Sequence, residues 1–223
     1  MISEPKNNVK RPARLADDVY DAIYWRLMLL EIPPEGRIPV DALARDLGVS
    51  QTPIREALSR LEMQKLVVKT HLIGYHAAPQ MDRKQCEDLY AIRLLLEPFC
   101  ARHAASAMDA EAIRSLDALN IAMRQLETGR QRSDYGKFAQ LDAEFHDRIA
   151  VHGGNNLVKD TLRGLHAHVH LFRLFYHARA TSEANKEHDA IVKAIGNRDP
   201  LGAEHAMAEH ISRSRDRFMA FYG

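Results

Sequence analysis

The chain has 223 residues, enough for one large domain or two small ones, and its 46% hydrophobic and 27% charged residues are typical of a soluble globular protein. No apolar run reaches the ~18 residues of a membrane-spanning helix, and the polar N-terminus does not resemble a secretory signal, so membrane and exported proteins are excluded. Two cysteines, Cys86 and Cys100, exclude a disulfide framework and indicate the cytoplasm, and a net charge of +1 means that any attraction to nucleic acid depends on where the charges lie.

The N-terminal third of the chain is predicted to begin with an arm and a long helix. Residues 1–14 are polar and basic and are expected to be flexible. A helix is predicted over 15–30, where apolar residues recur at helical spacing, namely Val19, Ile23, Leu27 and Leu30. The turn-forming run Pro33-Pro34-Glu35-Gly36 ends this helix.

Two shorter helices and a hairpin are predicted next. The first helix covers about 40–47 and stops at Gly48, and the second runs from its N-cap, Ser50, to about Lys65. Two β-prone runs around a turn at Gly74 then predict a hairpin. Helix, helix, turn, helix and hairpin is the order of a winged helix-turn-helix, so residues 15–78 are interpreted as a DNA-binding domain.

A linker is expected over 79–82, and no strand signal follows it. Apolar residues recur every three or four positions in six stretches, at about 83–107, 109–128, 134–152, 156–180, 183–196 and 199–221. Residues that favour helix caps precede five of them, namely Asp109, Ser133, Asn155, Ser182 and Asp199. The fold class is therefore predicted as mainly α, with a C-terminal antiparallel bundle of six helices over 83–223.

The helix after Gly48 is predicted to read DNA, because the first residues of the third helix of this fold meet base edges in the major groove. Those residues are Ser50, Gln51, Thr52 and Arg55. Phosphate contacts, which position a protein without specifying a sequence, are assigned to Arg45, Arg60 and Lys69, and the hairpin is expected to bring His71 to the adjacent groove. Periodicity alone does not separate this domain from any other three-helix core with a hairpin.

A sequence motif distinguishes this domain from other three-helix cores with a hairpin. The run Leu43–Leu61, LARDLGVSQTPIREALSRL, closely resembles the signature of GntR-family transcription regulators, and residues 34–38 resemble the turn that precedes it. The chain departs from the family pattern at Gln51, where the family usually carries arginine, and at Val40, where it usually carries an acidic residue. Arginine pairs with guanine and glutamine with adenine, so an operator sequence unlike the family's usual one is expected.

Histidine is the unusual residue of the helical half, which holds ten of the twelve in the chain. Asp142 and His146 are four residues apart and share a helix face, and His188 and His210 lie on the last two predicted helices. Three imidazoles and a carboxylate suit Zn²⁺, and they also accept Ni²⁺, Mn²⁺ or Fe²⁺. The residues alone leave open that such pairs arise by chance, and His166 and His170, also four apart, form a rival pair.

A second resemblance covers about 83–223. Five stretches are similar to the FCD ligand domain of FadR-like GntR regulators, namely Leu89–Glu97, Asp142–His146, Asn155–Leu157, Glu187–Ile191 and Ala206–Ile211. In that family an aspartate and three histidines ligate a metal, so the resemblance implies a divalent transition metal held by Asp142, His146, His188 and His210. Six helices with a long first one look more like the VanR-type variant than the seven-helix form.

The resemblance also implies an effector, a small carboxylate that completes the shell of the metal. Arg93 is predicted to hold that carboxylate by a charge-assisted hydrogen bond, with a pairing to Glu97 on the same helix face as the alternative. Further pocket residues are predicted to be Asn156, His166, His170 and Arg173.

The predicted function is that of a bacterial repressor that binds an inverted-repeat operator in double-stranded DNA as a homodimer. Two alternatives are a helical domain that only dimerises and an HD-type metal-dependent phosphohydrolase, because His146-Asp147 and His188-Asp189 both spell HD. Asp147 and Asp189 are expected to point away from the metal, about 100° round their helices from the preceding histidines. A DNA-reading head makes catalysis superfluous, so the chain is predicted not to be an enzyme.

Overall fold

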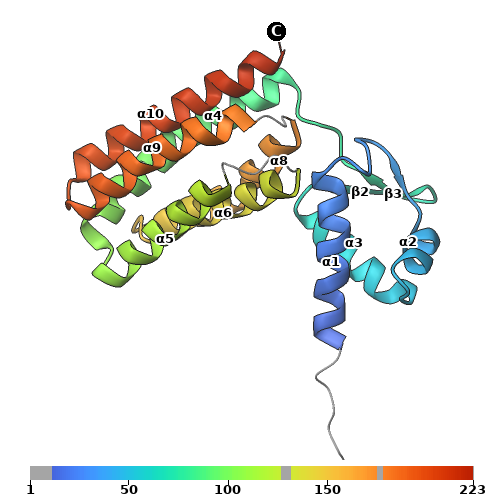
Figure 1. Cartoon of the computed structure of the whole chain (residues 1–223). Helices are drawn as coiled ribbons and strands as arrows, with labels where there is room; N and C mark the ends of the chain where they lie inside the picture. Colours follow the sequence, from blue (N-terminus) through green and yellow to red (C-terminus); the bar gives the residue numbers. More distant parts are fainter. Residues whose placement is uncertain (1–11, 127–131, 175–177, 223) are drawn as a thin grey trace, which may run out of the picture. The chain divides into compact units, whose positions relative to one another are not determined.

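The computed structural model describes residues 12–126, 132–174 and 178–222. They divide between Pro79 and Gln80 into two compact units (Figure 1). Most of the arm predicted over 1–14 lies outside the described residues. The first helix is already present at Pro12, the first described residue, three residues before its predicted start.

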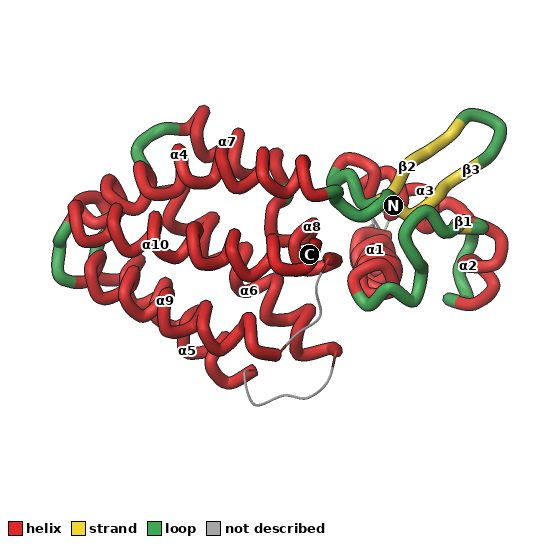
Figure 2. Tube along the Cα trace, turned by 90° about the horizontal axis from the view of Figure 1, so that it is seen from above, coloured by secondary structure: helices red, strands yellow, loops and turns green. Residues whose placement is uncertain are grey.

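The first unit is the winged helix-turn-helix that the sequence predicts. Its elements are α1 (Pro12–Met28), β1 (Arg37–Ile38), α2 (Val40–Asp46), α3 (Gln51–Met63), β2 (Val67–Thr70) and β3 (Gly74–Ala77). Helix α1 packs on α3, and their facing side chains are fully buried, among them Ile23, Leu27, Ile54 and Leu58. The β2–β3 hairpin projects beyond the helices of this unit (Figure 2).

The sheet of the first unit has a third strand, which the sequence analysis missed. The strand order is β1-β3-β2, with Arg37 opposite His76 and Ile38 opposite Tyr75 in an antiparallel pair. A strand of two residues is too short to show the alternation that identifies strands in a sequence. Its pairing depends on β3, which lies almost forty residues away in the chain.

The second unit contains seven α-helices in the described part of the chain. They are α4 (Arg83–Ala107), α5 (Ala110–Leu126), α6 (Arg132–Val151), α7 (Asn156–Leu165), α8 (Ala167–Leu174), α9 (Ala178–Gly196) and α10 (Pro200–Met219), followed by a 3₁₀ turn over Ala220–Tyr222. Helix α10 packs between α4 and α9, while α6 packs against α5 and α8 (Figures 1 and 2). The buried histidines described below lie between α9 and α10 on one side and α6 and α8 on the other.

The prediction of six helices in this unit, on which the likeness to the VanR-type variant was based, is wrong. The helix predicted over 156–180 divides at His166, which adopts a left-handed conformation with φ of 47° and separates α7 from α8. Residues 175–177 of the same prediction lie outside the described residues. The apolar pattern continues across the break, so periodicity does not reveal it.

Three of the predicted helix caps are confirmed by side-chain hydrogen bonds to backbone N–H groups, namely those of Asp109, Asn155 and Asp199. Ser133 and Ser182 lie inside α6 and α9, so their predicted capping roles are wrong. Ser50 occupies the N-cap position of α3 without a side-chain hydrogen bond to the helix.

The start of the second unit is anchored to helices far away in sequence. Asp82 and Gln85 form a reciprocal capping box at the start of α4. The side-chain amide of Gln80 donates to the backbone carbonyl of Arg173 at 2.5 Å, and the hydroxyl of Tyr222 donates to the carbonyl of Met81 at 2.8 Å. These bonds connect residues of the predicted linker with the end of α8 and with the C-terminal turn.

Among the described residues, no helix combines the length and the apolar character needed to cross a membrane.

Candidate functional site

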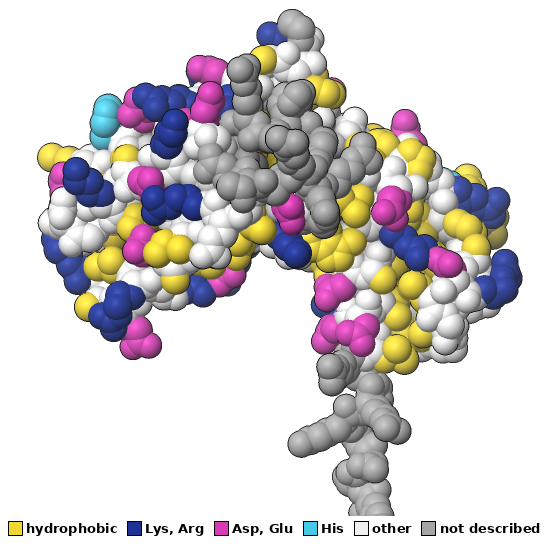
Figure 3. Space-filling model, viewed as in Figure 1, with side chains coloured by type: hydrophobic (Ala, Val, Ile, Leu, Met, Phe, Trp, Pro, Cys, Tyr) yellow, Lys and Arg dark blue, Asp and Glu magenta, His cyan; other side chains and the backbone are white. Residues whose placement is uncertain are grey.

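The exposed face of α3 carries the side chains predicted to read DNA. Gln51, Thr52 and Arg55 are exposed, while Ile54 and Leu58 on the opposite face are fully buried. The amphipathic pattern therefore leaves the polar residues at the helix start available to a partner. Basic and acidic side chains are interspersed on the face of the molecule drawn in Figure 3, in agreement with a net charge close to zero.

Both polar groups of the Gln51 amide are engaged. Its Nε2 donates to Asp41 Oδ1 at 2.5 Å, and its Oε1 accepts from Arg55 at 3.4 Å. A bidentate contact from glutamine to adenine uses the same donor and acceptor, so Gln51 must release Asp41 and Arg55 before it reads a base.

The other predicted DNA contacts differ in how freely they reach solvent. Arg45 is exposed and makes no ion pair with any described residue, and His71 is exposed at the hairpin tip. Lys69 lies over the ring of Tyr75, 5.6 Å from its centroid. Arg60 bonds to Asp17 at 2.8 Å and lies 4.2 Å from the ring centroid of a tyrosine on α1. Arg60 thus helps to pack α1 on α3, a role that the sequence analysis did not assign to it.

The four predicted metal ligands converge in the second unit. Asp142 and His146 come from α6, His188 from α9 and His210 from α10, and all four side chains are buried. The Nε2 atoms of His146 and His210 are 3.2 Å apart, and the Nε2 of His188 lies 3.3 Å from Asp142 Oδ1. Ligand atoms of the three histidines all lie within 4.8 Å of one another. The four predicted ligands, of which Asp142 and His210 are 68 positions apart in the sequence, therefore face one point in the bundle.

A further histidine lies beside this cluster. His168, on α8, donates through Nδ1 to Asp142 Oδ2 at 2.7 Å, and it forms a second close group with Asp142 and His146. His168 is not among the ligands predicted from the sequence. It stands between His166 and His170, the rival pair, and the break at His166 turns it toward α6.

Burial favours the neutral form of two imidazoles of the cluster, those of His146 and His188. It lowers the pKa of His146 to about 4 and holds the pKa of His188 well below its usual value. Burial would raise the pKa of Asp142, but attraction to His168 and the hydrogen bond from it outweigh burial, and the pKa lies well below the usual range. Neutral imidazoles beside an ionised carboxylate are the forms that ligate metals.

The geometry of the cluster fits a divalent transition metal. Two nitrogens bound to one tetrahedral Zn²⁺ lie about 3.3 Å apart, close to the observed 3.2 Å between His146 Nε2 and His210 Nε2. Neither ring nitrogen of His188 has a hydrogen-bond partner among the described residues, although its ring is completely buried. A buried polar group without a partner is costly, and a metal ion would use one of these nitrogens.

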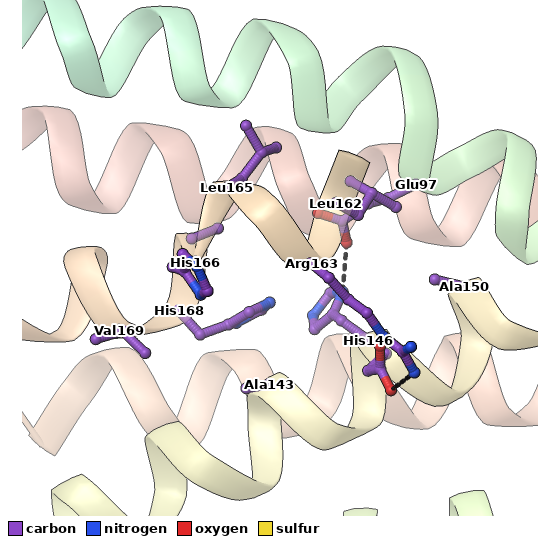
Figure 4. Close-up of a pocket in the computed structure, with 12 residues that line it drawn as sticks. Glu97, Ala143, His146, Ala150, Leu162, Arg163, Leu165, His166, His168 and Val169 are labelled. Carbon is purple, nitrogen blue, oxygen red and sulfur yellow. Dashed lines mark hydrogen bonds and ion pairs between the residues drawn. The ribbon is translucent and has the colours of Figure 1, made fainter. Parts of the chain in front are cut away.

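A cavity of about 350 Å³ adjoins the cluster. Its wall on the cluster side is formed by His146, His168 and Glu97, and Figure 4 shows the rings of His146 and His168 pointing toward each other. Arg163 and Asp147 line it as an exposed ion pair, with Arg163 Nη2 2.9 Å from Asp147 Oδ2. The rest of the lining is mainly apolar, namely Ala143, Ala150, Leu162, Leu165, Ala167 and Val169. The volume suits a small organic molecule.

The predicted effector residues are only partly brought together. His166 lines the larger cavity, whereas Arg93 lines a second cavity of about 20 Å³ with Asp142, His168 and His210. Arg93 is buried and paired with Glu97, which was the alternative reading of its role. Asn156, His170 and Arg173 line neither cavity, and Asn156 is exposed in the first turn of α7.

The two HD pairs do not form a catalytic site. Asp189 bonds to Asn120 at 2.6 Å and to Arg124, away from the histidines. Asp147 lines the larger cavity but is held by Arg163, and it belongs to neither close group of ligands. The expectation that both aspartates turn away from the cluster therefore holds for Asp189, while Asp147 comes nearer than expected.

Two protein families match the chain. The FCD domain family matches residues 88–213, and the gntR family of bacterial regulatory proteins matches residues 15–75. The Nta operon transcriptional regulator of Aminobacter aminovorans is 29% identical over 83% of this chain and 86% of its own. A protein of Paenarthrobacter nicotinovorans named "probable D-xylose utilization operon transcriptional repressor" is 30% identical over 80% of each chain. The Escherichia coli structure named McbR/YncC superposes with a TM-score of 0.74 at 18% identity, covering 100% of both chains, and shows the same fold.

Proposed function

The chain belongs to the gntR family of bacterial regulatory proteins and carries an FCD domain, and from this premise we propose that it is a metal-dependent, carboxylate-responsive repressor. It is a transcriptional regulator with a DNA-binding head and not an enzyme, because the matched families and the relatives named above are regulators. The proposed repressor binds an inverted-repeat operator as a dimer, and its helical unit senses the effector.

The observation that carries the sensing proposal is the convergence of three buried imidazoles and one carboxylate on a single point. Asp142, His146, His188 and His210 would hold the ion, with Zn²⁺ favoured by the nitrogen-rich donor set and Ni²⁺, Mn²⁺ or Fe²⁺ as the other candidates. When bound, such an ion would supply a positive charge in an apolar bundle, and because four protein ligands fill a tetrahedral shell, an effector oxygen would enter as a fifth ligand.

The charges around the cluster indicate what would provide that fifth ligand. The ion-paired groups linked to the cluster are the carboxylates of Asp142, Glu97 and Glu187 and the guanidinium groups of Arg93 and Arg217, and with neutral histidines they sum to one net negative charge. A divalent ion turns this into one net positive charge. A ligand with a single negative charge restores neutrality, which buried sites favour strongly. We therefore assign the effector to the small carboxylates.

The larger cavity is the proposed effector site, since His146 of the metal cluster forms its inner wall and Arg163 lines it from the exposed side. Arg163→Met should weaken the best carboxylate from a thermal-shift screen by about three- to tenfold, a modest loss because the guanidinium is half exposed and screened. Asp147→Asn should change affinity in the opposite direction, because it frees Arg163 for the ligand. Isothermal titration of the metal-loaded protein measures both.

The control for that pair of variants is Arg148→Met, which removes an arginine of α6 that is paired with Glu144 and does not line the cavity. It should leave the affinity unchanged. Equal affinities in wild type, Arg163→Met and Asp147→Asn would remove the ion pair from the effector site and leave the metal assignment intact.

Exposed apolar side chains on α4 support the proposed dimer. Ile92, Leu95 and Phe99 form one strip, and Leu95 is 75% exposed. Asp88 and Arg102 lie seven residues before and after Leu95, so they share its helix face. Two α4 helices crossing antiparallel at Leu95 would place each aspartate opposite the arginine of the second copy.

The function itself is tested by coupling between effector and operator. Effector binding must change operator affinity by about 5- to 150-fold, which corresponds to a coupling of roughly 1–3 kcal/mol. The proposed route passes through the Gln80 side chain, because it bonds to the end of the same α8 helix that carries His168. Gln80→Ala should keep effector and operator binding but reduce the coupling.

The measurement is a fluorescence-anisotropy titration of operator DNA with and without the carboxylate. An effector that binds tightly and leaves operator affinity unchanged would overturn the sensor proposal and favour a helical domain that only dimerises. Unchanged coupling in Gln80→Ala would reject only the proposed route.

A further inference from the structure

Two series of hydrogen-bonded side chains, each running from an arginine through a glutamate to a histidine, end at the histidine cluster. In the first, Arg93 Nε bonds to Glu97 Oε1 at 2.5 Å, and Glu97 Oε2 accepts from His146 Nδ1. Both Arg93 and Glu97 are on α4, one turn apart, and both are almost completely buried. This series brings a side chain of α4 to an imidazole of α6.

The second series repeats the same order of groups on other helices. Arg217 on α10 makes a bidentate pair with Glu187 on α9, at 2.7 and 2.8 Å. Glu187 Oε2 accepts from His210 Nδ1 at 2.8 Å. The order arginine, glutamate, histidine thus occurs twice, from four different helices, at two of the four proposed ligands.

Each series determines which nitrogen of its histidine is free. A carboxylate that accepts from Nδ1–H leaves the lone pair on Nε2, because a neutral imidazole carries a single N–H. The two Nε2 atoms selected in this way, those of His146 and His210, are the pair that lie 3.2 Å apart at the centre of the cluster. The hydrogen bonds to the two glutamates therefore leave the Nε2 atoms of His146 and His210 unprotonated and facing one point.

Pairing with an arginine distinguishes Glu97 and Glu187 from Asp142, the third carboxylate at the cluster. Both oxygens of Glu97 and both oxygens of Glu187 accept hydrogen bonds from an arginine or a histidine. Asp142 is paired with no arginine among the described residues, and its Oδ1 faces His188 and His146. The pattern distinguishes one ligating carboxylate from two that support ligands.

We propose that Glu97 and Glu187, each held by its arginine, are positioning residues that set the metal affinity of the site. They act by fixing the tautomer and orientation of His146 and His210 and by making both imidazoles more basic. The inference rests on the proposed metal site, and it adds to that site two glutamates and two arginines outside the ligand set.

The test compares Glu187→Gln and Glu187→Ala with Glu209→Gln as the matched control. Glu209 precedes the ligand His210 on α10 but is exposed and paired with Arg213, so its loss should not affect the metal. Zn²⁺ affinity, measured by competition with a chromophoric chelator, should fall by about 10–100-fold in Glu187→Ala. Glu187→Gln should recover part of the loss, because its amide oxygen still accepts from Nδ1–H.

A second readout separates positioning from mere stability. Co²⁺ reports its ligand field in its visible absorption, so Glu187→Ala and Glu97→Gln should shift the spectrum of the bound ion, whereas Glu209→Gln should match wild type. If Glu97→Gln does not fold, Arg93→Lys tests the same series, since it keeps a charge beside Glu97 but loses the planar fork. Circular dichroism of each metal-free variant verifies the fold.

The outcomes separate the inference from the function it rests on. Wild-type Zn²⁺ affinity and an unchanged Co²⁺ spectrum in the folded glutamate variants would overturn the positioning role while the metal site stands. A wild-type protein that takes up neither Zn²⁺ nor Co²⁺ would overturn the metal site itself. Loss of affinity in Glu209→Gln to the same extent as in Glu187→Ala would also overturn the inference.

Discussion

Replacement of His210 by alanine is expected to abolish tight metal binding and the stability that comes with it. The loss should exceed the roughly 10–100-fold that changes outside the ligand set cost, because a ligand itself is removed. A metal present at about 100 times its Kd stabilises the fold by about 2.7 kcal/mol, which corresponds to roughly 5–10 °C in the Tm of a unit of this size. Differential scanning fluorimetry with and without Zn²⁺ measures this shift, and elemental analysis should find about one metal ion per wild-type chain.

The matched control is His205→Ala, which removes an exposed histidine from the same helix, five residues earlier. It should keep both the metal and the Zn²⁺-dependent rise in Tm. His188→Ala should behave like His210→Ala, because neither ring nitrogen of the buried His188 has a hydrogen-bond partner among the described residues. Full metal retention in both His188→Ala and His210→Ala would show that the ligands have been assigned to the wrong residues.

Replacement of Arg55 by alanine is expected to abolish discrimination between operator and non-operator DNA. A bidentate arginine contact to guanine is worth about 1–3 kcal/mol, and a dimer would lose two, so operator affinity should fall by roughly 30- to 20,000-fold. Arg55 is exposed on the polar face of α3 and its one hydrogen bond, to Gln51, is long at 3.4 Å. The fold should therefore survive the change. Competition between operator and random DNA in a gel-shift assay measures the loss.

Arg45→Ala is the contrasting variant, because a phosphate contact carries no sequence information. It should weaken binding to operator and random DNA alike and reduce the slope of log affinity against log salt by about 0.9 per head. If Arg55→Ala discriminates as well as wild type, the start of α3 does not read the bases. If Arg45→Ala alters discrimination instead, the two assignments must be exchanged.

The DNA-binding head was predictable because its information is local. Apolar spacing, turn residues and β-prone runs act within a few positions, and together they indicated α1, α2, α3 and the β2–β3 hairpin. Strand β1 escaped because a two-residue strand exists only through its pairing with β3. The engagement of Gln51 by Asp41 likewise depends on how α2 meets α3, which no spacing rule reports.

In the helical unit, the sequence by itself indicated the helices, apart from the break at His166 and the start of α9, and the set of proposed ligands. Asp142 and His146 share a helix face by spacing, His188 and His210 lie on the last two predicted helices, and the resemblance implies that all four hold one metal. Only the tertiary structure decided the surroundings of that set. Contacts between α4 and α6, and between α9 and α10, made Glu97 and Glu187 partners of histidines and bound Arg93 into the support of His146. They also turned His168 toward Asp142 and put Arg163 on the cavity wall. Helical periodicity specifies which face a residue occupies, but partners on other helices depend on how the helices pack, and packing is a property of the whole bundle.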